Sequence, residues 1–374
     1  YLFNLELFKD NRDNISFSTN STELEKCDIV FISSDVPTDS KGKSSLDTIY
    51  NLIGKVSSKL SESALLVILC QVPPGFSRRL SFPKNRLFYQ VETLIFGRAM
   101  ERVLQPERFI VGSDNVDHDL PIIYEQYLLR FKCPILVMRY ESAELAKISI
   151  NFFLVSSVTT ANILAEVCEK IGADWNEIVP ALQLDKRIGE YAYLKPGLGI
   201  SGGNLERDLA TILKISEEKG THNSVIKEWV ANSKYRKNWL SNCFRYDVLP
   251  NFSNKIIDIC LLGLAYKENT HSIKNSPSIN FILELKDLNV RIRTHDPRVQ
   301  NTKLPNYCSR LKNIQECVHN ADVLVIGTPW EEYKEISVEY LAESMNGKFV
   351  IDPYQILDGD SLIEIGIKYF TLGK

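Results

Sequence analysis

The chain has 374 residues, of which 44% are hydrophobic and 24% are charged, and its formal net charge is −3. This length allows two or three domains with substantial cores. The composition excludes a disordered chain, and the charge balance argues against a nucleic-acid binder. We expect no apolar run of transmembrane length and no signal peptide, and therefore a cytoplasmic protein without a membrane partner.

The eight cysteines are widely spaced and form no CxxC pair. Several stand in apolar stretches, as Cys70 does shortly after the run Leu65-Leu66-Val67-Ile68-Leu69. This pattern predicts buried, reduced thiols in a cytosolic protein. No metal site is expected, because the five histidines show no ligand spacing with these thiols.

Short apolar runs predict an α/β domain in the first part of the chain. The stretch 46–61 has a helical pattern, and no GxGxxG turn precedes Asp28, although a dinucleotide-binding domain normally opens with one. We therefore expect the first βαβ unit of this domain to be absent from the given chain. The predicted buried parallel strands are 28–33, 64–71, 87–89, 109–111 and 134–137.

The pattern becomes helical from Ser142 to about Ser233, where apolar residues recur every three to four positions. A second αβ alternation follows. Its predicted strands are 256–262, 290–294, 323–327, 349–351 and 369–370. We predict an α/β fold in which two Rossmann-like, doubly wound domains, 1–140 and 251–374, are joined by a central helical region, 141–250.

Two segments carry polar residues in a pattern suited to chemistry. Glu144, Lys147 and Asn151 recur at helical intervals, so an ammonium and an amide share one helix face that could hold a hydroxyl or an oxyanion. In the later loop 197–208, glycines permit positive φ and close backbone approach, and Asp208 is expected to cap the next helix. The alternative is a glycine-rich connection beside a solvated helix face.

Colinear motifs along the chain resemble those of the UDP-glucose/GDP-mannose dehydrogenase family. The resemblance runs from the first residues to the last. The matching stretches include Cys27-Asp28-Ile29-Val30-Phe31-Ile32, Val72-Pro73-Pro74-Gly75, Pro106-Glu107-Arg108-Phe109-Ile110-Val111-Gly112, Ser142-Ala143-Glu144-Leu145-Ala146-Lys147, Asp185-Lys186-Arg187-Ile188-Gly189, Gly263-Leu264-Ala265-Tyr266-Lys267 and His295-Asp296-Pro297.

This resemblance implies an oxidoreductase that uses NAD, acts on a nucleotide-linked sugar and forms a homodimer through its central helices. NADP is not excluded, because the residue that selects the ribose hydroxyl is expected ahead of the given chain. Lys147 and Asn151 would assist hydride transfer and hold an oxyanion, Asp208 would support the lysine, and Glu92 would act as acid, base or water activator. The other residues implied are Arg187, Gly199, Gly202 and Lys267 for the substrate, and Val36, Pro37, Gln71 and Lys274 for the cofactor.

The family's nucleophilic cysteine has no counterpart. Counting back from Asp208 places Asn204 at its position, and alignment on the paired glycines places Leu205 there instead. A thiol is needed in the family because it forms the thiohemiacetal through which an aldehyde becomes a carboxylate. The sequence therefore predicts a two-electron oxidation, in which Asn204 could act as an oxyanion donor. The alternative is a catalytically silent homologue that binds nucleotide sugars or regulates a partner.

Overall fold

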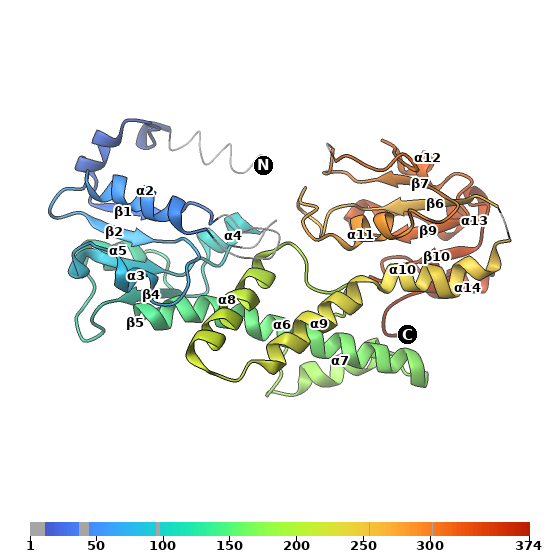
Figure 1. Ribbon diagram of the computed structural model, residues 1–374, viewed down its shortest axis with the longest axis horizontal. Coiled ribbons are helices and arrows are strands. Elements are labelled where there is room, and N and C mark those ends of the chain that lie inside the picture. The colour runs from blue at the N-terminus through green and yellow to red at the C-terminus, as the bar shows by residue number, and fades with distance from the viewer. Residues whose placement is uncertain (1–11, 37–44, 95–97, 254, 301) are drawn as a thin grey trace. The chain divides into compact units, whose positions relative to one another are not determined.

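The computed structural model describes residues 12–36, 45–94, 98–253, 255–300 and 302–374 (Figure 1). Backbone contacts divide the chain into two compact units. The first unit contains nearly all described residues up to Lys147, and the second contains Ile148–Lys374. The central helices and the C-terminal sheet thus belong to the same unit.

The first unit is built on a five-stranded sheet with strand order β1-β2-β3-β4-β5. Residues of β2 alternate between its two faces, since Leu66 and Ile68 lie in one core cluster and Leu65 and Val67 lie in another. The sheet is therefore covered on both sides, as predicted for a doubly wound domain. The strands are β1 (Ile29–Ile32), β2 (Leu65–Ile68), β3 (Leu87–Gln90), β4 (Phe109–Ser113) and β5 (Ile135–Arg139).

Helices pack on each face of this sheet. Helix α2 (Asp47–Ser57) contributes to the first core cluster, and α5 (Ile122–Leu129) contributes to the second. The shorter elements are α3 (Phe76–Arg79), α4 (Ala99–Leu104) and the 3₁₀ turns η1 (Arg12–Asn14), η2 (Ser21–Lys26) and η3 (Lys84–Arg86).

One strand pairing differs from the prediction of a parallel sheet. Strands β1, β2 and β3 are parallel, but β4 runs antiparallel to β3, and β5 is parallel to β4. An antiparallel neighbour does not require the helical crossover that a parallel neighbour needs. An apolar run in the sequence indicates a buried strand but does not reveal its direction.

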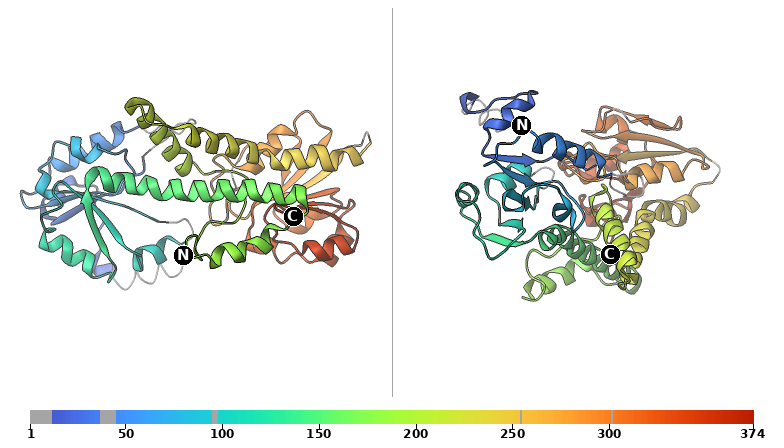
Figure 2. Two further views of the ribbon diagram at one scale, coloured as in Figure 1. Left: turned by 90° about the horizontal axis from the view of Figure 1, so that it is seen from below. Right: turned by 60° about the vertical axis from the view of Figure 1, so that its left-hand side comes forward.

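Helix α6 (Tyr140–Ile171) is a continuous helix of 32 residues (Figure 2). Contrary to the expectation from the sequence, it is long and apolar enough to cross a membrane by length and composition, since an 18-residue stretch of it has a mean hydropathy of 1.5. However, Glu144 and Asn151 are hydrogen-bonded to other parts of the protein, and Glu169 accepts a hydrogen bond from Gly373. These contacts favour a helix packed within the protein.

The predicted helical region continues beyond α6. Helix α8 ends at Lys219, and Gly220 follows it in the left-handed conformation that favours glycine. The elements are α7 (Trp175–Leu184), α8 (Asn204–Lys219), α9 (Ser224–Lys237), α10 (Trp239–Cys243), the π-helical turn η4 (Phe244–Val248) and the 3₁₀ turn η5 (Leu249–Asn251).

The second sheet has six parallel strands in the order β11-β10-β9-β6-β7-β8. This is the strand order of a Rossmann domain, with its switch point between β6 and β9. The short strand β8 is not indicated by the sequence, because Cys-Ser-Arg is not an apolar run. The strands are β6 (Ile257–Leu262), β7 (Val290–His295), β8 (Cys308–Arg310), β9 (Val323–Ile326), β10 (Phe349–Ile351) and β11 (Lys368–Phe370).

Helices and a 3₁₀ turn connect these strands. Residues of α11, α12, α13 and α14 join the strands in one large core cluster, which includes Phe281, Cys317, Leu341 and Leu362. The elements are α11 (Pro277–Glu284), α12 (Ile314–Val318), η6 (Glu331–Tyr333), α13 (Val338–Ser344) and α14 (Gly359–Glu364).

Candidate active site

Glu144, in the first turns of α6, has a structural role that its helical spacing did not reveal. Its side chain is fully buried, and its carboxylate accepts hydrogen bonds from the backbone N–H groups of Gly75 at 2.5 Å and Ser77 at 2.8 Å. Burial raises the pKa of Glu144, and the hydrogen bonds from Ser77 and Gly75 oppose this shift. The carboxylate thus ties α6 to the turn that follows Val72-Pro73-Pro74.

Lys147 lies one turn further along α6. Its Nζ atom donates a hydrogen bond to the backbone carbonyl of Glu92 at 2.5 Å. Glu92 follows the end of β3 and is half-buried. The structure therefore brings together two residues that the sequence assigned to catalysis, although the contact uses the backbone of Glu92 and not its carboxylate.

Asn151 and Asp208 form a pair in the second unit. The Asn151 Nδ2 atom donates to Asp208 Oδ2 at 2.5 Å, and the Asp208 side chain is buried beside Arg207, whose Nε atom is 3.8 Å away. Asp208 does not cap α8 as expected. The helix begins at Asn204, with Gly203 as its N-cap. Asp208 instead lies in the second turn, where a buried carboxylate can orient the Asn151 amide.

The paired glycines Gly202 and Gly203 have φ angles of +88° and +102°. A Cβ atom on Gly202 would lie 2.6 Å from the Tyr266 ring, and a Cβ atom on Gly203 would lie 2.9 Å from Nζ of Lys274. The Gly202 N–H group also donates to the Lys274 carbonyl at 3.1 Å. The loop is therefore folded closely against the segment that follows β6, and glycine is required at both positions.

The two candidates for the cysteine position have different surroundings. Asn204 is exposed at the first position of α8. Leu205 packs against a core cluster that contains Ile200 and Leu209. Only Asn204 thus presents its side chain to solvent at the start of the helix.

The predicted substrate residues differ in how far they are buried and in what they contact. Lys267 is half-buried, with its Nζ atom 5.9 Å from the centre of the Tyr266 ring, and burial lowers its pKa. A Cβ atom on Gly199 would lie 2.4 Å from the Ser233 carbonyl, so this glycine allows α9 to pack closely. Arg187 has 88% of its side chain exposed and pairs with Asp185, two residues earlier. It is not brought to the loop by a hydrogen bond or ion pair that the described residues reveal.

The predicted cofactor residues are divided between the units. Val36 is buried after β1, and Gln71 is half-buried after β2, whereas Pro37 lies outside the described residues. Val36 and Gln71 fit a dinucleotide, because ligands bind at the carboxyl ends of parallel strands and the Gln71 amide can both donate and accept. Lys274 instead lies against Gly203 in the second unit. NAD would supply the hydride acceptor when bound.

A cavity of about 590 Å³ lies in the second unit. It is lined by the segment that leads from Glu190 to Pro196 and by the turn after β10 that includes Tyr354 and Gln355. Tyr191 and Tyr193 are 89% and 51% exposed and offer aromatic surfaces. The cavity is large enough for a small ligand and lies at the carboxyl edge of the sheet, where a Rossmann domain binds ligands.

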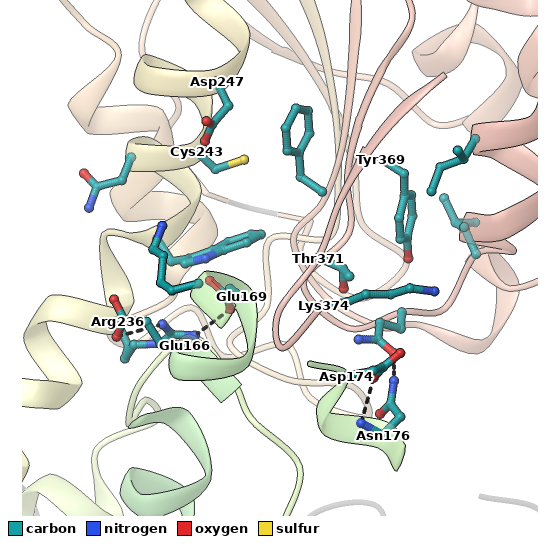
Figure 3. A pocket seen from close by; sticks show the side chains of 18 of the residues that line it. Glu166, Glu169, Asp174, Asn176, Arg236, Cys243, Asp247, Tyr369, Thr371 and Lys374 are labelled. Atoms are coloured by element: carbon teal, nitrogen blue, oxygen red, sulfur yellow. Dashed lines mark hydrogen bonds and ion pairs between the residues drawn. The ribbon is translucent and has the colours of Figure 1, made fainter. Parts of the chain in front are cut away.

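A larger cavity, of about 900 Å³, lies in the same unit and shares Asn176 and Gln355 with the first (Figure 3). Its charged side chains contact one another: Arg236, which is 1% exposed, lies 3.4 Å from Glu166 and 3.9 Å from Glu169. Tyr235 also donates to Glu166 at 2.5 Å. None of the predicted catalytic residues lines this cavity.

The cysteines are all free, and six of the eight are buried as predicted. Cys27 and Cys133 are half-buried instead. In the second unit every cysteine is buried, so none provides an exposed thiol. These five are Cys168, Cys243, Cys260, Cys308 and Cys317.

Sequence profiles of one family match most of the chain. The NAD binding domain of the UDP-glucose/GDP-mannose dehydrogenase family matches residues 5–127, the central domain matches 141–234, and the UDP binding domain matches 260–359. UDP-glucose 6-dehydrogenase of Rickettsia typhi is 28% identical, and the match covers 97% of this chain and 86% of that protein. A putative UDP-glucose 6-dehydrogenase of Bacillus subtilis is 26% identical over 96% of this chain and 86% of its own.

Solved structures have the same fold. UDP-D-ManNAc dehydrogenase from Pyrococcus horikoshii is similar with a TM-score of 0.80 and 21% identity, covering 95% of this chain and 83% of that one. A UDP-glucose dehydrogenase from Pyrobaculum islandicum has a TM-score of 0.79 and 23% identity, covering 96% and 83%. The chain therefore belongs to the UDP-glucose/GDP-mannose dehydrogenase family, whose members are NAD-dependent oxidoreductases that act on nucleotide sugars.

Proposed function

We propose that the protein oxidises a hydroxyl group of a UDP-linked hexose by two electrons and releases an aldehyde or ketone. The observation that carries this proposal is Asn204, which stands exposed at the first position of α8 and which we assign to the position of the family's cysteine. An amide cannot attack the aldehyde carbon to form the covalent intermediate that a thiol forms. The burial of the five cysteines in the second unit supports the same conclusion.

This oxidation needs a base and a group that stabilises the developing charge on oxygen. Glu92 is assigned as the base that accepts the hydroxyl proton, and NAD, when bound, would supply the acceptor for the hydride. Lys147 and Asn151 hold the substrate oxygen. The Asn151 amide has two N–H groups, and only one is needed for Asp208. The second can donate to the substrate oxygen.

The nucleotide part of the substrate is assigned to the second unit. Lys267 carries the positive charge that a diphosphate requires, and Tyr266 lies beside it. Tyr191 and Tyr193 of the smaller cavity offer stacking surfaces for a base. The relatives named as UDP-glucose 6-dehydrogenases favour UDP-glucose as the first substrate to test.

The test is to incubate the protein with NAD⁺ and a panel of nucleotide sugars, and to record NADH formed per sugar consumed together with the product mass. One NADH per sugar and a product lighter by two hydrogens is the expected result. Two NADH per sugar with a carboxylate product would overturn the two-electron mechanism, and Glu92 would then be the candidate for activating the attacking water.

A second candidate function is a silent homologue that binds nucleotide sugars. The absence of a thiol at residue 204 in the sequence favours this reading as well, because it removes the family's second reaction step. Calorimetry separates the two functions. Binding of UDP-glucose without NADH formation, for every sugar tested, would support the silent homologue.

We also propose that the protein forms a homodimer, because one face of α6 exposes apolar side chains. Phe153 and Ile171 are 77% and 71% exposed, and Leu164 and Val167 share their helix face with 42% and 45% exposure. A second copy of the chain would cover this apolar stripe. Light scattering should find a dimer that Phe153→Asp with Ile171→Asp converts to a monomer. The control is Ile122→Asp, at a residue of α5 with 73% exposure. A monomeric wild-type protein would contradict the proposal.

A further inference from the structure

Asp296, directly after β7, holds together three turns at the carboxyl edge of the second sheet. Its side chain is buried, and Oδ2 accepts hydrogen bonds from the N–H groups of Leu264 at 2.7 Å and Ala265 at 2.9 Å. The indole N–H of Trp330, after β9, donates to the same oxygen at 3.3 Å. The other oxygen, Oδ1, accepts from Arg298 and Val299 at 2.8 Å each.

In many Rossmann domains, an acidic residue at the position of Asp296 binds the cofactor and does not hold the protein backbone. In a dinucleotide-binding domain, an acidic residue near the end of the second strand receives the ribose hydroxyl of the cofactor. β7 is the second strand of this sheet in chain order, and Asp296 stands at its end. A carboxylate has about four acceptor sites, and here five donors from the protein already occupy them. Asp296 therefore organises the protein and does not bind ribose.

The turn that Asp296 holds leads directly to the proposed substrate residues. Gly263 has a φ of +99°, and a Cβ atom there would lie 2.5 Å from Thr328. Thr328 Oγ1 donates to the Ala265 carbonyl at 2.6 Å. The backbone is thus fixed by Asp296 on one side and by Thr328 on the other, immediately before Tyr266.

We propose that Asp296 is a positioning residue for nucleotide-sugar binding, which acts by fixing the backbone that presents Tyr266 and Lys267. Tyr266 packs on Gly202, and Lys267 lies beside the Tyr266 ring, so a shift of the turn moves both side chains and the glycine loop together. This inference rests on the proposed assignment of the UDP moiety to this edge of the sheet.

The experiment measures the Kd of UDP by calorimetry for the wild-type protein and for Asp296→Asn. Asparagine keeps the shape of the side chain, but its amide nitrogen cannot accept the hydrogen bonds that one carboxylate oxygen accepted. We expect UDP affinity to fall by about tenfold, from the loss of one or two charge-assisted hydrogen bonds that hold the turn. The KM for NAD should stay unchanged.

Asp322 supplies a matched control at the opposite edge of the same sheet. It is also buried, and it accepts hydrogen bonds from Lys255 at 2.8 Å and from the N–H of Asp258 at 3.0 Å. Asp322→Asn should lower the melting temperature as Asp296→Asn does but leave the Kd of UDP unchanged. A merely structural role for Asp296 predicts that the two variants bind UDP equally.

If Asp296→Asn does not fold, Thr328→Val tests the same turn from its other side, and we expect it to weaken UDP binding by about threefold through the loss of one neutral hydrogen bond. Unchanged UDP binding in whichever of these variants folds would overturn the positioning role alone. Failure of the wild-type protein to bind UDP would overturn the proposed substrate assignment and this inference with it.

Discussion

Lys147 and Asn151 stand one turn apart on α6, yet each is held by a different kind of partner. In the first unit, the Lys147 ammonium donates to a neutral backbone carbonyl. In the second unit, the Asn151 amide donates to a buried carboxylate. Both hydrogen bonds are charge-assisted, because the lysine brings the charge to one of them and the aspartate brings it to the other. The comparison teaches that the amide depends on a neighbouring carboxylate for its charge, whereas the ammonium carries its own charge to a substrate oxygen.

The largest expected effect comes from removing the ammonium. Lys147→Met should lower kcat by about 10²–10⁴, the range for loss of a group that assists proton transfer and stabilises charge. Stopped-flow NADH formation measures this change. Lys170→Met, at an exposed lysine of the same helix, should leave kcat unchanged. If Lys147→Met has the same kcat as Lys170→Met, the Lys147 ammonium has no role in the reaction.

The second effect tests the carboxylate that holds the amide. Asp208→Asn removes the charge beside Asn151 and keeps the volume. A charge-assisted hydrogen bond contributes about 1.5–3 kcal/mol, so we expect kcat to fall by about ten- to a hundredfold. Steady-state kinetics with the nucleotide sugar provides the measurement. An unchanged kcat would show that Asn151 does not need the Asp208 carboxylate for catalysis. The kind of hydrogen-bond partner would then have no effect on the reaction rate.

The third effect concerns product and not rate. Asn204→Cys places a thiol at the exposed first position of α8, where the helix N-terminus lowers a thiol pKa. We expect the ratio of NADH to sugar to rise from one toward two, with a carboxylate product identified by mass. Asn204→Ser should stay near one. If the cysteine variant also stays at one, then another difference from the family blocks the second oxidation.

The smallest effect is a pH dependence. Burial lowers the pKa of Lys267 below its ordinary value of 10.5, and binding of a diphosphate requires the charged form. We therefore expect kcat/KM for the nucleotide sugar to fall as pH rises through this lowered pKa. Lys267→Arg should abolish this fall of kcat/KM at high pH, because arginine stays charged. If kcat/KM of this variant still falls as pH rises, the titrating group is not residue 267.

The same lowered pKa makes the stability of the folded protein change with pH in the opposite direction: stability rises with pH, whereas kcat/KM falls. The contribution of Lys267 to the free energy of unfolding is present above its unfolded pKa and is lost as pH falls through the folded pKa. Lys267→Met should therefore be more stable at neutral pH than the wild-type protein while binding UDP more weakly. Thermal unfolding followed by circular dichroism checks the first of these expectations.

Much of the fold could be predicted because apolar runs report burial directly. The strands at 65–68 and 257–262 emerged from such runs, whereas β8 did not, since its three residues carry no comparable signal. The direction of β4 depends on a chain reversal that periodicity does not encode. The apolar character of α6 was underestimated, because charged residues such as Glu144, Lys147 and Glu169 interrupt the pattern although they are hydrogen-bonded within the protein.

The candidate site was predicted less completely. Helical spacing placed Lys147 and Asn151 on one helix, and resemblance indicated Asp208, but the expected cap at Asp208 was wrong because Gly203 takes that position. The roles of Glu144 and Asp296 depend on backbone N–H groups far away in the sequence. Both residues lie in stretches that match the family, but such a match does not indicate which N–H groups a carboxylate will bind.

The folding of the glycine loop bears on how easily the chemistry of this protein can be altered. The loop takes its shape from Gly202 and Gly203, which pack on Tyr266 and Lys274, and the exposed side chain of residue 204 contributes little to that shape. Substitutions at this position should therefore cost little stability. Residue 204 is accordingly a site where directed evolution could exchange one reaction outcome for another without first finding compensatory mutations.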